Sequence, residues 1–384
     1  MLLNQIIDTY ISEIKNQTLI SPRCVTGRLA IYGCGDLGRM ALEYFNRIGI
    51  EVSFAVDRNA HLYSNDPFWN GIEVINPNEV DSETKNSVLL AVCVVTSPYK
   101  PISTELTASG WTDIVPFYDI TEAYRDIHPL SNGWFAKPFT DEDVEKIKIV
   151  LSGWGDEISR LHYIQFIAWR RLREEWVFES APVTTSDRFF IPEIISLLGS
   201  QEVFVDIGAH YGAVLSKFID HVNGGFSRII AIEPDQKNIN ELNLNINQHY
   251  LQYLNQIEIL PFSVGKSHEI LNFFNGLGYA SQLTALSKDK VQVYTVDELC
   301  LYPTYIKFHL EGGELDALKG AINTIHQSRP IIAVTSYHNS LGLMELPIWM
   351  IQNMPDYMFL MRLHSYCGTG AVIYAIPQER YIFV

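Results

Sequence analysis

The chain has 384 residues, of which 47% are hydrophobic and 19% are charged, and its formal net charge is −16. This length is enough for two domains, and the composition is typical of a globular rather than a disordered chain. The acidic balance argues against nucleic acid and anionic lipid as partners. The five cysteines form no CxxC pair, which argues against a disulfide framework and favours a cytoplasmic location.

The N-terminal segment shows apolar residues at helical spacing over residues 2–16. They are Leu3, Ile6, Ile7, Tyr10, Ile11 and Ile14. The spacing predicts an amphipathic helix that packs on the body of the protein. The segment lacks the features of a signal peptide, and no apolar run in the chain reaches the length of a membrane span.

A first α/β unit begins near Arg28. Residues 29–32 form an apolar run of strand type, a glycine-rich turn follows, and a second strand over residues 51–57 ends in an acid. The turn and the acid place Gly33, Gly35, Asp36, Gly38 and Asp57 in the pattern of a dinucleotide or nucleotide-sugar site. Further strands are expected over residues 88–96 and 113–117, which predicts a parallel sheet.

Three interpretations of this first unit remain open. The glycines can serve packing alone, the turn can bind a nucleotide or a nucleotide-linked sugar, or the unit can bind NAD for an oxidoreductase. The sequence of the unit offers no obvious group for hydride transfer, which disfavours the last of these.

A different pattern follows the first unit. Turn-forming residues near Pro129 and Pro138 mark a loop, and helices are expected over residues 141–151 and 158–177. We interpret residues 129–199 as a helical connector that packs on the second domain. Its arginines, Arg170, Arg171 and Arg173, are expected on a solvated helix face.

The second α/β unit begins at Val203. A strand over residues 203–207 runs into a glycine turn and a helix, and a second strand over residues 228–232 ends at Glu233. Strands and helices then alternate to a final strand pair over residues 357–363 and 371–376. This order predicts a seven-stranded sheet. Residues 266–290 read as an insertion, and Thr295 with Glu298 as a capping box.

The turn of the second unit has the pattern of a cofactor site. A strand that feeds a glycine turn lets the backbone approach a ligand closely, and an acid at the end of the next strand can accept hydrogen bonds from both ribose hydroxyls. The candidate cofactor-binding residues are Asp206, Gly208, Ala209, His210, Tyr211, Gly212, Glu233 and Pro234.

Polar residues also follow the later strands of this unit, at the edge where parallel sheets bind ligands. The candidate catalytic residues are His309, Glu311, His338 and His364. A histidine or a carboxylate there can remove a proton from an acceptor hydroxyl. The same residues also resemble the shell of a divalent metal ion, which is the less favoured interpretation. Glu314 lies in the first turn of a helix, where acids are common.

Residues 203–375 resemble the FkbM family of S-adenosylmethionine-dependent methyltransferases. The resemblance rests on residues 206–212, 233–235, 295–297 and, most specifically, 306–320. The usual family pattern has an Asp-x-Glu-Gly-x-Glu core. Here His309 replaces the Asp and Gly313 replaces a common Ala. The resemblance implies an O-methyltransferase that acts on sugars, glycans or other small molecules.

We therefore expect two Rossmann-like domains: residues 1–128 as the possible nucleotide-binding domain and residues 200–384 as a seven-stranded class I methyltransferase domain, joined by the connector. The expected cofactor is S-adenosyl-L-methionine. The expected partners are a small-molecule or glycan acceptor and a nucleotide-linked sugar. The alternatives are an NAD-dependent oxidoreductase and a scaffold that binds its ligands without catalysis.

Overall fold

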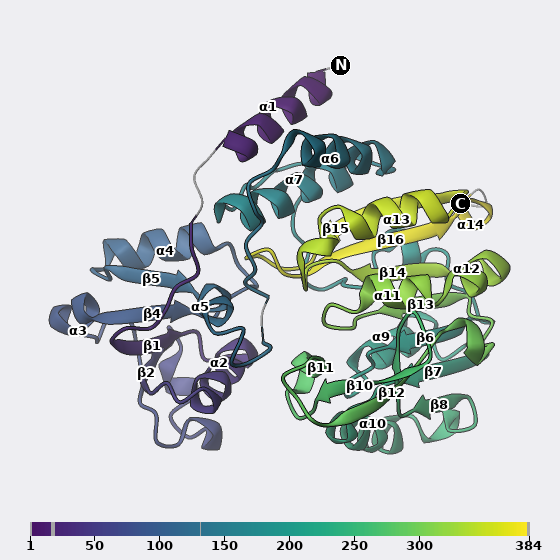
Figure 1. The fold of residues 1–384 in the computed structure, drawn as a ribbon. Coiled ribbons are helices and arrows are strands. Elements are labelled where there is room, and N and C mark those ends of the chain that lie inside the picture. Colours follow the sequence, from purple (N-terminus) through teal and green to yellow (C-terminus); the bar gives the residue numbers. More distant parts are fainter. Residues whose placement is uncertain (1, 17–19, 131, 382–384) are drawn as a thin grey trace. The chain divides into compact units, whose positions relative to one another are not determined.

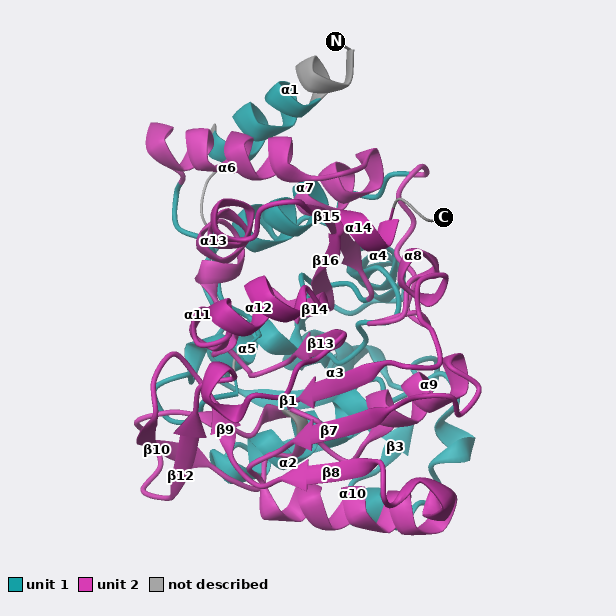
Figure 2. Cartoon of the chain, turned by 90° about the vertical axis from the view of Figure 1, so that its right-hand side faces the viewer, with its two compact units in different colours: residues 1–138, 164–178, 365–369 teal, residues 139–163, 179–364, 370–384 magenta. Residues whose placement is uncertain are grey.

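The computed structural model describes residues 2–16, 20–130 and 132–381, which fall into two compact units (Figure 2). Unit 1 comprises residues 1–138, 164–178 and 365–369, and unit 2 comprises residues 139–163, 179–364 and 370–384. Residues 129–199, which we expected to form one connector, are thus divided between the units. Within the described part of the chain, no helix has both the length and the apolar character needed to cross a membrane.

Unit 1 contains a five-stranded parallel sheet, drawn in purple and blue in Figure 1. Its strands are β1 (Arg28–Tyr32), β2 (Val52–Val56), β3 (Val74–Ile75), β4 (Val88–Val92) and β5 (Asp113–Pro116). They lie in the order β3-β2-β1-β4-β5. The predicted parallel sheet is confirmed, because its apolar runs are buried as such a sheet requires.

In unit 1, one helix precedes the first strand and the other helices follow or connect the strands. They are α1 (Leu2–Asn16), α2 (Asp36–Arg47), α3 (Ser82–Ser87), α4 (Tyr99–Ala108) and α5 (Phe117–Ala123), with short 3-10 turns η1 (Ala60–Leu62) and η2 (Pro67–Trp69). The predicted helix over residues 2–16 is present, and Ile7, Ile11 and Ile14 on it are buried. The side chains of Leu3 and Ile6 lie outside the described residues.

Two further helices lie in the part of the sequence between strand β5 of unit 1 and residue 203, where the sheet of unit 2 begins. Helix α6 (Asp141–Gly153) begins at a capping box, in which Thr140 and Asp143 accept hydrogen bonds from each other's backbone amides. Helix α7 (Glu157–Leu172) contributes residues 157–163 to unit 2 and residues 164–172 to unit 1.

The prediction of a solvated arginine face on this helix is wrong. Arg170 is 0% exposed and Arg171 is 3% exposed. The guanidinium of Arg170 donates to the carbonyls of Asn132 (2.6 Å) and Gly368 (2.6 Å) and stacks on Trp134. Arg173 follows the helix and pairs with buried Asp119 at 3.3 Å. Backbone carbonyls and aromatic faces distant in sequence replace water around these charges, which the helical spacing alone does not reveal.

Unit 2 contains the predicted seven-stranded sheet. Its strands are β6 (Val203–Ile207), β7 (Arg228–Ile232), β8 (Ile257–Leu260), β13 (Tyr305–Phe308), β14 (Ile331–Thr335), β15 (Tyr357–Leu363) and β16 (Ala371–Pro377). The order is β15-β16-β14-β13-β6-β7-β8, and β16 is antiparallel to both of its neighbours. The carboxyl ends of β6, β7, β13 and β14 therefore lie at one edge.

Helices connect these strands. They are α8 (Pro192–Ile195), α9 (Ala213–His221), α10 (Gln236–His249), α11 (Glu314–Lys319), α12 (Ile322–Ser328), α13 (Glu345–Asn353) and α14 (Gln378–Tyr381), with 3-10 turns η3 (Leu251–Tyr253), η5 (Asp297–Leu299) and η6 (Ser340–Gly342). The core combines aliphatic and aromatic side chains: Phe204 of β6 stacks on Phe218 of α9 with ring centroids 4.4 Å apart. This packing holds α9 against the sheet.

The predicted insertion forms a small sheet of its own in the order β11-β10-β12-β9. Its strands are β9 (Ser263–Val264), β10 (Glu269–Phe274), β11 (Gln282–Leu283) and β12 (Lys290–Tyr294), with the turn η4 (Gly278–Ala280). Phe273, Val291 and Val293 form its core. The capping box is present directly after it, since Thr295 Oγ1 accepts from the Glu298 amide and Glu298 accepts from that of Thr295.

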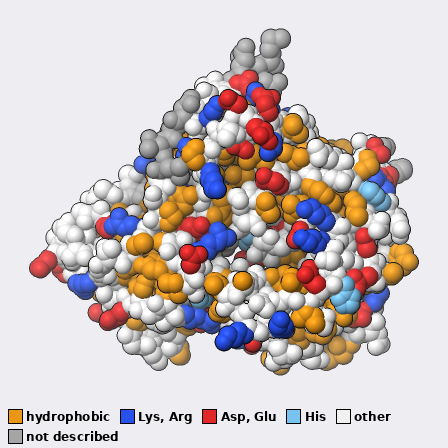
Figure 3. Space-filling model, in the orientation of Figure 1, with side chains coloured by type: hydrophobic (Ala, Val, Ile, Leu, Met, Phe, Trp, Pro, Cys, Tyr) orange, Lys and Arg blue, Asp and Glu red, His pale blue; other side chains and the backbone are white. Residues whose placement is uncertain are grey.

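The surface carries mixed charge. Basic and acidic side chains are interspersed with apolar ones on the face in Figure 3. All five cysteines are free thiols, in agreement with the expectation that they form no disulfide framework.

Candidate functional site

The glycine turn after β6 needs its glycines for geometric reasons. Gly208 has φ +74°, and a Cβ atom on it would lie 2.0 Å from the carbonyl oxygen of His309. Gly212 has φ +89° and precedes the first residue of α9. His210 also adopts a positive φ of 49°. No side chain fits between this turn and the end of β13, so the backbone itself forms the surface there.

Glu233 holds the turn from the end of β7. Its Oε2 accepts a hydrogen bond from the His210 amide at 2.9 Å, and its Oε1 accepts from the Asp235 amide at 2.9 Å. The side chain is 3% exposed, and burial raises the pKa of its carboxyl although these amides oppose the shift. Glu233 thus lies against the turn, as its position at the end of the second strand led us to expect.

Asp206 lies beside a lysine that the sequence interpretation did not single out. Asp206 on β6 and Lys307 on β13 are register partners, their charged atoms are 2.8 Å apart, and both side chains are fully buried. Burial raises the pKa of Asp206 and lowers the pKa of Lys307, and each group opposes the shift of the other. Lys307 also donates to the carbonyl of Gly208 at 2.6 Å. Lys307 therefore links the Asp206 carboxylate to the Gly208 carbonyl and holds the turn in place.

The loop of the small sheet is tied to the same place. Asp235 Oδ2 accepts from the Gly276 amide and from Ser281 Oγ, both at 2.6 Å. Asn238 donates to the Gly278 carbonyl at 3.2 Å. The stretch after Glu233 therefore anchors residues 276–281 beside the turn.

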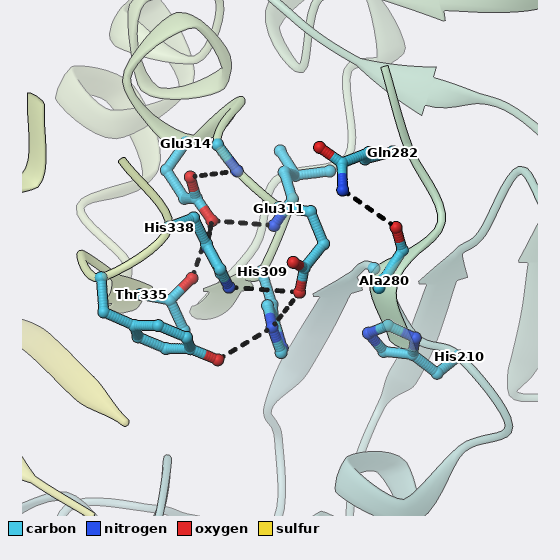
Figure 4. A network of polar contacts seen from close by, with 12 residues as sticks. His210, Ala280, Gln282, His309, Glu311, Glu314, Thr335 and His338 are labelled. Atoms are coloured by element: carbon cyan, nitrogen blue, oxygen red, sulfur yellow. Dashed lines mark hydrogen bonds and ion pairs between the residues drawn. The ribbon is translucent and has the colours of Figure 1, made fainter. Parts of the chain in front are cut away.

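Three of the predicted catalytic residues form one group (Figure 4). Glu311 Oε1 lies 3.1 Å from His309 Nε2 and 3.1 Å from His338 Nε2. The two imidazole rings are stacked with centroids 5.0 Å apart. We call His309, Glu311 and His338 the His/Glu group.

Glu314 supports this group from behind. It accepts from His338 Nδ1 at 2.5 Å, from the amides of Leu310 and Gly312 at 3.0 Å and from Thr335 Oγ1 at 2.9 Å. The first-turn position of Glu314 is therefore only part of its role, because its carboxylate organises a buried network.

The charges in the network differ between the two histidines. Burial lowers the pKa of His309 far below its usual range, and the charges of Arg188 and His338 act in the same direction. Burial works against a charged His338, but the carboxylates of Glu311 and Glu314 raise its pKa well above the usual range. Burial also opposes a charged Glu314, yet His338 and the amides hold its pKa below the usual value. The surroundings therefore favour the neutral form of His309 and the charged form of His338.

His364 has partners outside the His/Glu group. Its Nδ1 lies 2.9 Å from the Thr184 carbonyl and 3.0 Å from Asp187 Oδ1, and its Nε2 lies 2.8 Å from the Tyr374 hydroxyl. Of the four predicted catalytic residues, the structure therefore brings three together, and it places His364 among other groups.

The glycine turn after β6 and the His/Glu group are neighbours. The rings of His210 and His309 have centroids 5.3 Å apart. The remaining predicted turn residues are nearby in the chain: Ala209 is buried, Pro234 is half-buried and Tyr211 is 36% exposed. Glu233, the turn and the His/Glu group thus form one continuous candidate site at the strand ends of unit 2.

The glycine turn over residues 33–38 belongs to unit 1. A Cβ atom on Gly38 would lie 2.0 Å from the Gly33 carbonyl oxygen, so both glycines serve close helix–strand packing. Asp57 accepts from the amides of Cys34 (2.9 Å) and Asn59 (2.8 Å). Gly35 and Asp36 are exposed, and no atom lies within 4 Å of a Cβ built on Gly35. Nucleotide binding by this turn remains a prediction.

Residues 206–368 match the family model of the methyltransferase FkbM domain. A crystal structure of a methyltransferase FkbM from Methylobacillus flagellatus is 20% identical, covers 95% of this chain and 93% of its own, and gives a TM-score of 0.64. That likeness shows a shared fold.

A precorrin-6y C5,15-methyltransferase from Geobacter metallireducens is 14% identical and covers 52% of this chain and 95% of its own, with a TM-score of 0.31. A score this low supports no argument. No curated protein matches the chain in sequence.

Unit 2 also contains site residues that the sequence interpretation missed. Arg188 donates to the Tyr337 hydroxyl at 2.8 Å, and that hydroxyl lies 3.4 Å from His309 Nε2. The residue type offers one clue to Lys307, because a lysine inside an apolar strand must find a buried partner. The sequence offers no comparable clue to Arg188, since it precedes the sheet by more than ten residues.

Proposed function

We propose that this chain is an S-adenosylmethionine-dependent O-methyltransferase that methylates a hydroxyl of a sugar, a glycan precursor or another small molecule. One observation carries the proposal: the Glu233-bound glycine turn lies beside the His/Glu group, with the His210 and His309 rings 5.3 Å apart. A donor site and a site able to handle a proton are thus adjacent.

The residues of the turn suit S-adenosylmethionine. Gly208 and Gly212 present backbone without side chains. Glu233 Oε1 accepts from the Asp235 amide and from Asn238, whereas among the described residues Oε2 accepts only from the His210 amide and retains acceptor capacity for a ribose hydroxyl. Asp206 Oδ2 is buried and forms no hydrogen bond with any described residue. When bound, the cofactor supplies an electrophilic methyl carbon attached to a positively charged sulfur.

Methylation of a hydroxyl requires the protein to orient the acceptor oxygen and to favour loss of its proton. A new bond forms between the acceptor oxygen and the methyl carbon, the electron pair of the broken carbon–sulfur bond stays with sulfur, and the hydroxyl proton must leave. The His/Glu group supplies buried polar atoms that can orient the oxygen and favour loss of the proton. An amine acceptor has less need of a group that favours loss of a proton. The presence of the His/Glu group therefore favours a hydroxyl acceptor over an amine.

Calorimetry with S-adenosylhomocysteine tests the cofactor part. Glu233→Gln removes one strong acceptor and is expected to weaken binding about tenfold or more. Glu258→Gln is the matched control, since Glu258 is an exposed acid on the neighbouring strand β8 that pairs with Arg228. Absence of binding to the unaltered chain, or equal affinities for the two variants, would contradict the proposal.

A panel of acceptors tests the reaction. Release of S-adenosylhomocysteine is expected with sugars or nucleotide-linked sugars and not with amines of similar size. Turnover with amines alone would refute the hydroxyl assignment. Tight cofactor binding without turnover on any acceptor would favour the scaffold alternative.

Unit 1 gives a second, separate proposal: that its turn binds the nucleotide part of the acceptor. The open space at Gly35 supports it, and the same space makes Gly35→Asp a mild steric change that adds repulsion for phosphate. Titration of the full chain with uridine diphosphate and with NADH distinguishes the alternatives. Binding of neither ligand would leave packing as the role of the glycines.

A further inference from the structure

We propose that His309 Nε2, Glu311 Oε1 and His338 Nε2 bind a divalent transition-metal ion. These three atoms lie within 4.8 Å of one another. Two imidazoles and one carboxylate form the ligand set of many zinc and iron sites that keep positions open for a substrate.

The spacing fits a shared ion. Ligand atoms that each lie about 2.1 Å from a metal are about 3.0 Å apart at right angles and about 3.4 Å apart at the tetrahedral angle, so a four- or five-coordinate site needs spacings in this range. Glu311 Oε1 is 3.1 Å from the nitrogen of each histidine. A cation therefore fits among these atoms with small movements of the side chains.

Glu314 provides the support that a metal-binding histidine needs. Histidine ligands commonly donate their second ring nitrogen to a carboxylate, which fixes the orientation of the ring. His338 Nδ1 donates to Glu314 Oε1 at 2.5 Å, and the Leu310 and Gly312 amides hold Glu314. The other nitrogen, His338 Nε2, is buried, faces Glu311 and lacks hydrogen-bond alignment with any described residue.

The backbone presents Glu311 to the histidines in a strained conformation. Glu311 has φ +47°, and the next residue, Gly312, has φ +109°. Asn339 holds this turn by donating to the Gly312 carbonyl at 2.9 Å. A left-handed glutamate costs free energy and tends to persist where function requires it. Here the strain directs the Glu311 carboxylate to the space between the histidines (Figure 4).

Nitrogen ligands decide the kind of ion. Two imidazoles favour zinc, cobalt or iron over magnesium, which prefers oxygen. Three protein ligands leave positions for the acceptor oxygen, and a hydroxyl bound to such an ion loses its proton more readily. This catalytic role rests on the proposed methyl transfer, whereas binding of the ion does not.

Metal titration of the full chain tests the site. After treatment with a chelator and removal of that chelator, the chain is expected to bind one equivalent of Zn²⁺, counted by elemental analysis. His338→Gln and Glu311→Gln are expected to weaken binding about a hundredfold or more. His268→Gln is the matched control, because His268 forms an exposed pair with Glu298 at 3.0 Å, and it should leave the affinity unchanged.

A second measurement uses only the unaltered chain, so misfolding of a variant cannot account for its result. Co²⁺ added to the unaltered chain is expected to show the intense visible absorption of a four- or five-coordinate site, and Zn²⁺ should displace it. A weak six-coordinate spectrum, or equal loss of Zn²⁺ in the His268 variant, would overturn the inference. S-adenosylhomocysteine binding without Zn²⁺ binding would overturn it while leaving the proposed function intact, and Zn²⁺ binding alone would do the reverse.

Discussion

Asp206 and Lys307 form a buried ion pair whose partners depend on each other. Replacing Lys307 with Met leaves the Asp206 carboxylate buried without its counter-charge. We expect the free energy of unfolding to fall by about 3–5 kcal/mol, because a lone buried charge is far more costly than a buried pair. Urea denaturation of the variant and of the unaltered chain measures the difference.

The double variant Asp206→Asn/Lys307→Met is the control for this pair. Removing both charges should recover a large part of the stability, since no uncompensated charge remains. Equal destabilisation by the single and the double substitution would show that the two side chains are not coupled.

His162 gives unit 2 a dependence of stability on pH. The Leu363 amide donates to Nδ1 at 3.2 Å, so Nε2, 3.1 Å from the Ala181 carbonyl, carries the proton. Burial lowers the pKa of His162 to about 4, and the charge of Arg362 and neighbouring His364 act in the same direction. As the pH decreases, His162 is protonated in the unfolded chain before it is protonated in the folded chain. Its contribution to the free energy of unfolding is therefore fully present above about pH 6.5 and is lost as the pH decreases towards 4.

Substitution of His162 isolates this contribution. The linkage amounts to about 2 kcal/mol at pH 5 relative to pH 7. The unaltered chain should lose that much more stability than His162→Asn between these two pH values, measured by urea denaturation. Parallel pH profiles for the two proteins would contradict the assignment.

Some individual site residues could be predicted from the sequence and others could not. Spacing after predicted strands identified Glu233, His309 and His338, because the carboxyl ends of parallel strands meet at one edge. The burial of Arg170 was not predictable, since its partners Asn132 and Gly368 lie 38 and 198 residues away. A local pattern carries no information on such partners.

At the scale of elements, the turn between β6 and α9 depends on the absence of one side chain. A Cβ on Gly208 would lie 2.0 Å from the His309 carbonyl oxygen, and φ is +74°. Gly208→Ala must therefore push β13 away from the turn while it adopts a strained backbone. We expect a loss of about 2 kcal/mol or more in unfolding free energy, measured by thermal or urea denaturation.

Gly313→Ala is the matched control on the neighbouring loop. Gly313 has φ −88°, and the nearest atom to its Cβ would be that of Leu310 at 3.5 Å, an ordinary contact. This substitution restores the residue common in the resembling family, and it should change stability by less than about 1 kcal/mol. Similar losses for the two variants would contradict the steric explanation.

The elements with strong patterns were predictable, and the short ones were not. Apolar runs gave every strand of the seven-stranded sheet, because buried parallel strands are continuous in hydrophobicity. Strand β3 has two residues, and helix α3 has six polar ones, so neither shows a periodic pattern of apolar residues. The small sheet spans residues 263–294. The sequence pattern predicted only an insertion over residues 266–290, because the alternation there is weak and the core is small.

At the scale of the whole molecule, the two units are not contiguous in sequence. Unit 1 takes residues 164–178 from the middle of the chain and residues 365–369 from the loop between β15 and β16. An interpretation along the sequence proposes continuous domains, because composition and turn residues reveal only local boundaries. Contacts between segments that are distant in sequence join the parts of unit 1, and the hydrogen bond from Arg170 to Gly368 is one of them.

This exchange of segments predicts the result of a truncation. A chain of residues 139–384 retains Arg170 and Arg173 but loses Asp119 and the Asn132 and Trp134 carbonyls that bind them. Each buried guanidinium left without partners costs several kcal/mol. The truncated chain should therefore give little soluble protein and melt well below the full chain in circular dichroism. A chain of residues 20–384 keeps every one of these partners and loses helix α1 with its buried Ile7, Ile11 and Ile14, so it should melt cooperatively at a temperature between those of the truncated chain and the full chain. If residues 139–384 melted cooperatively at the temperature of the full chain, the buried arginines would not be what binds these segments to unit 1.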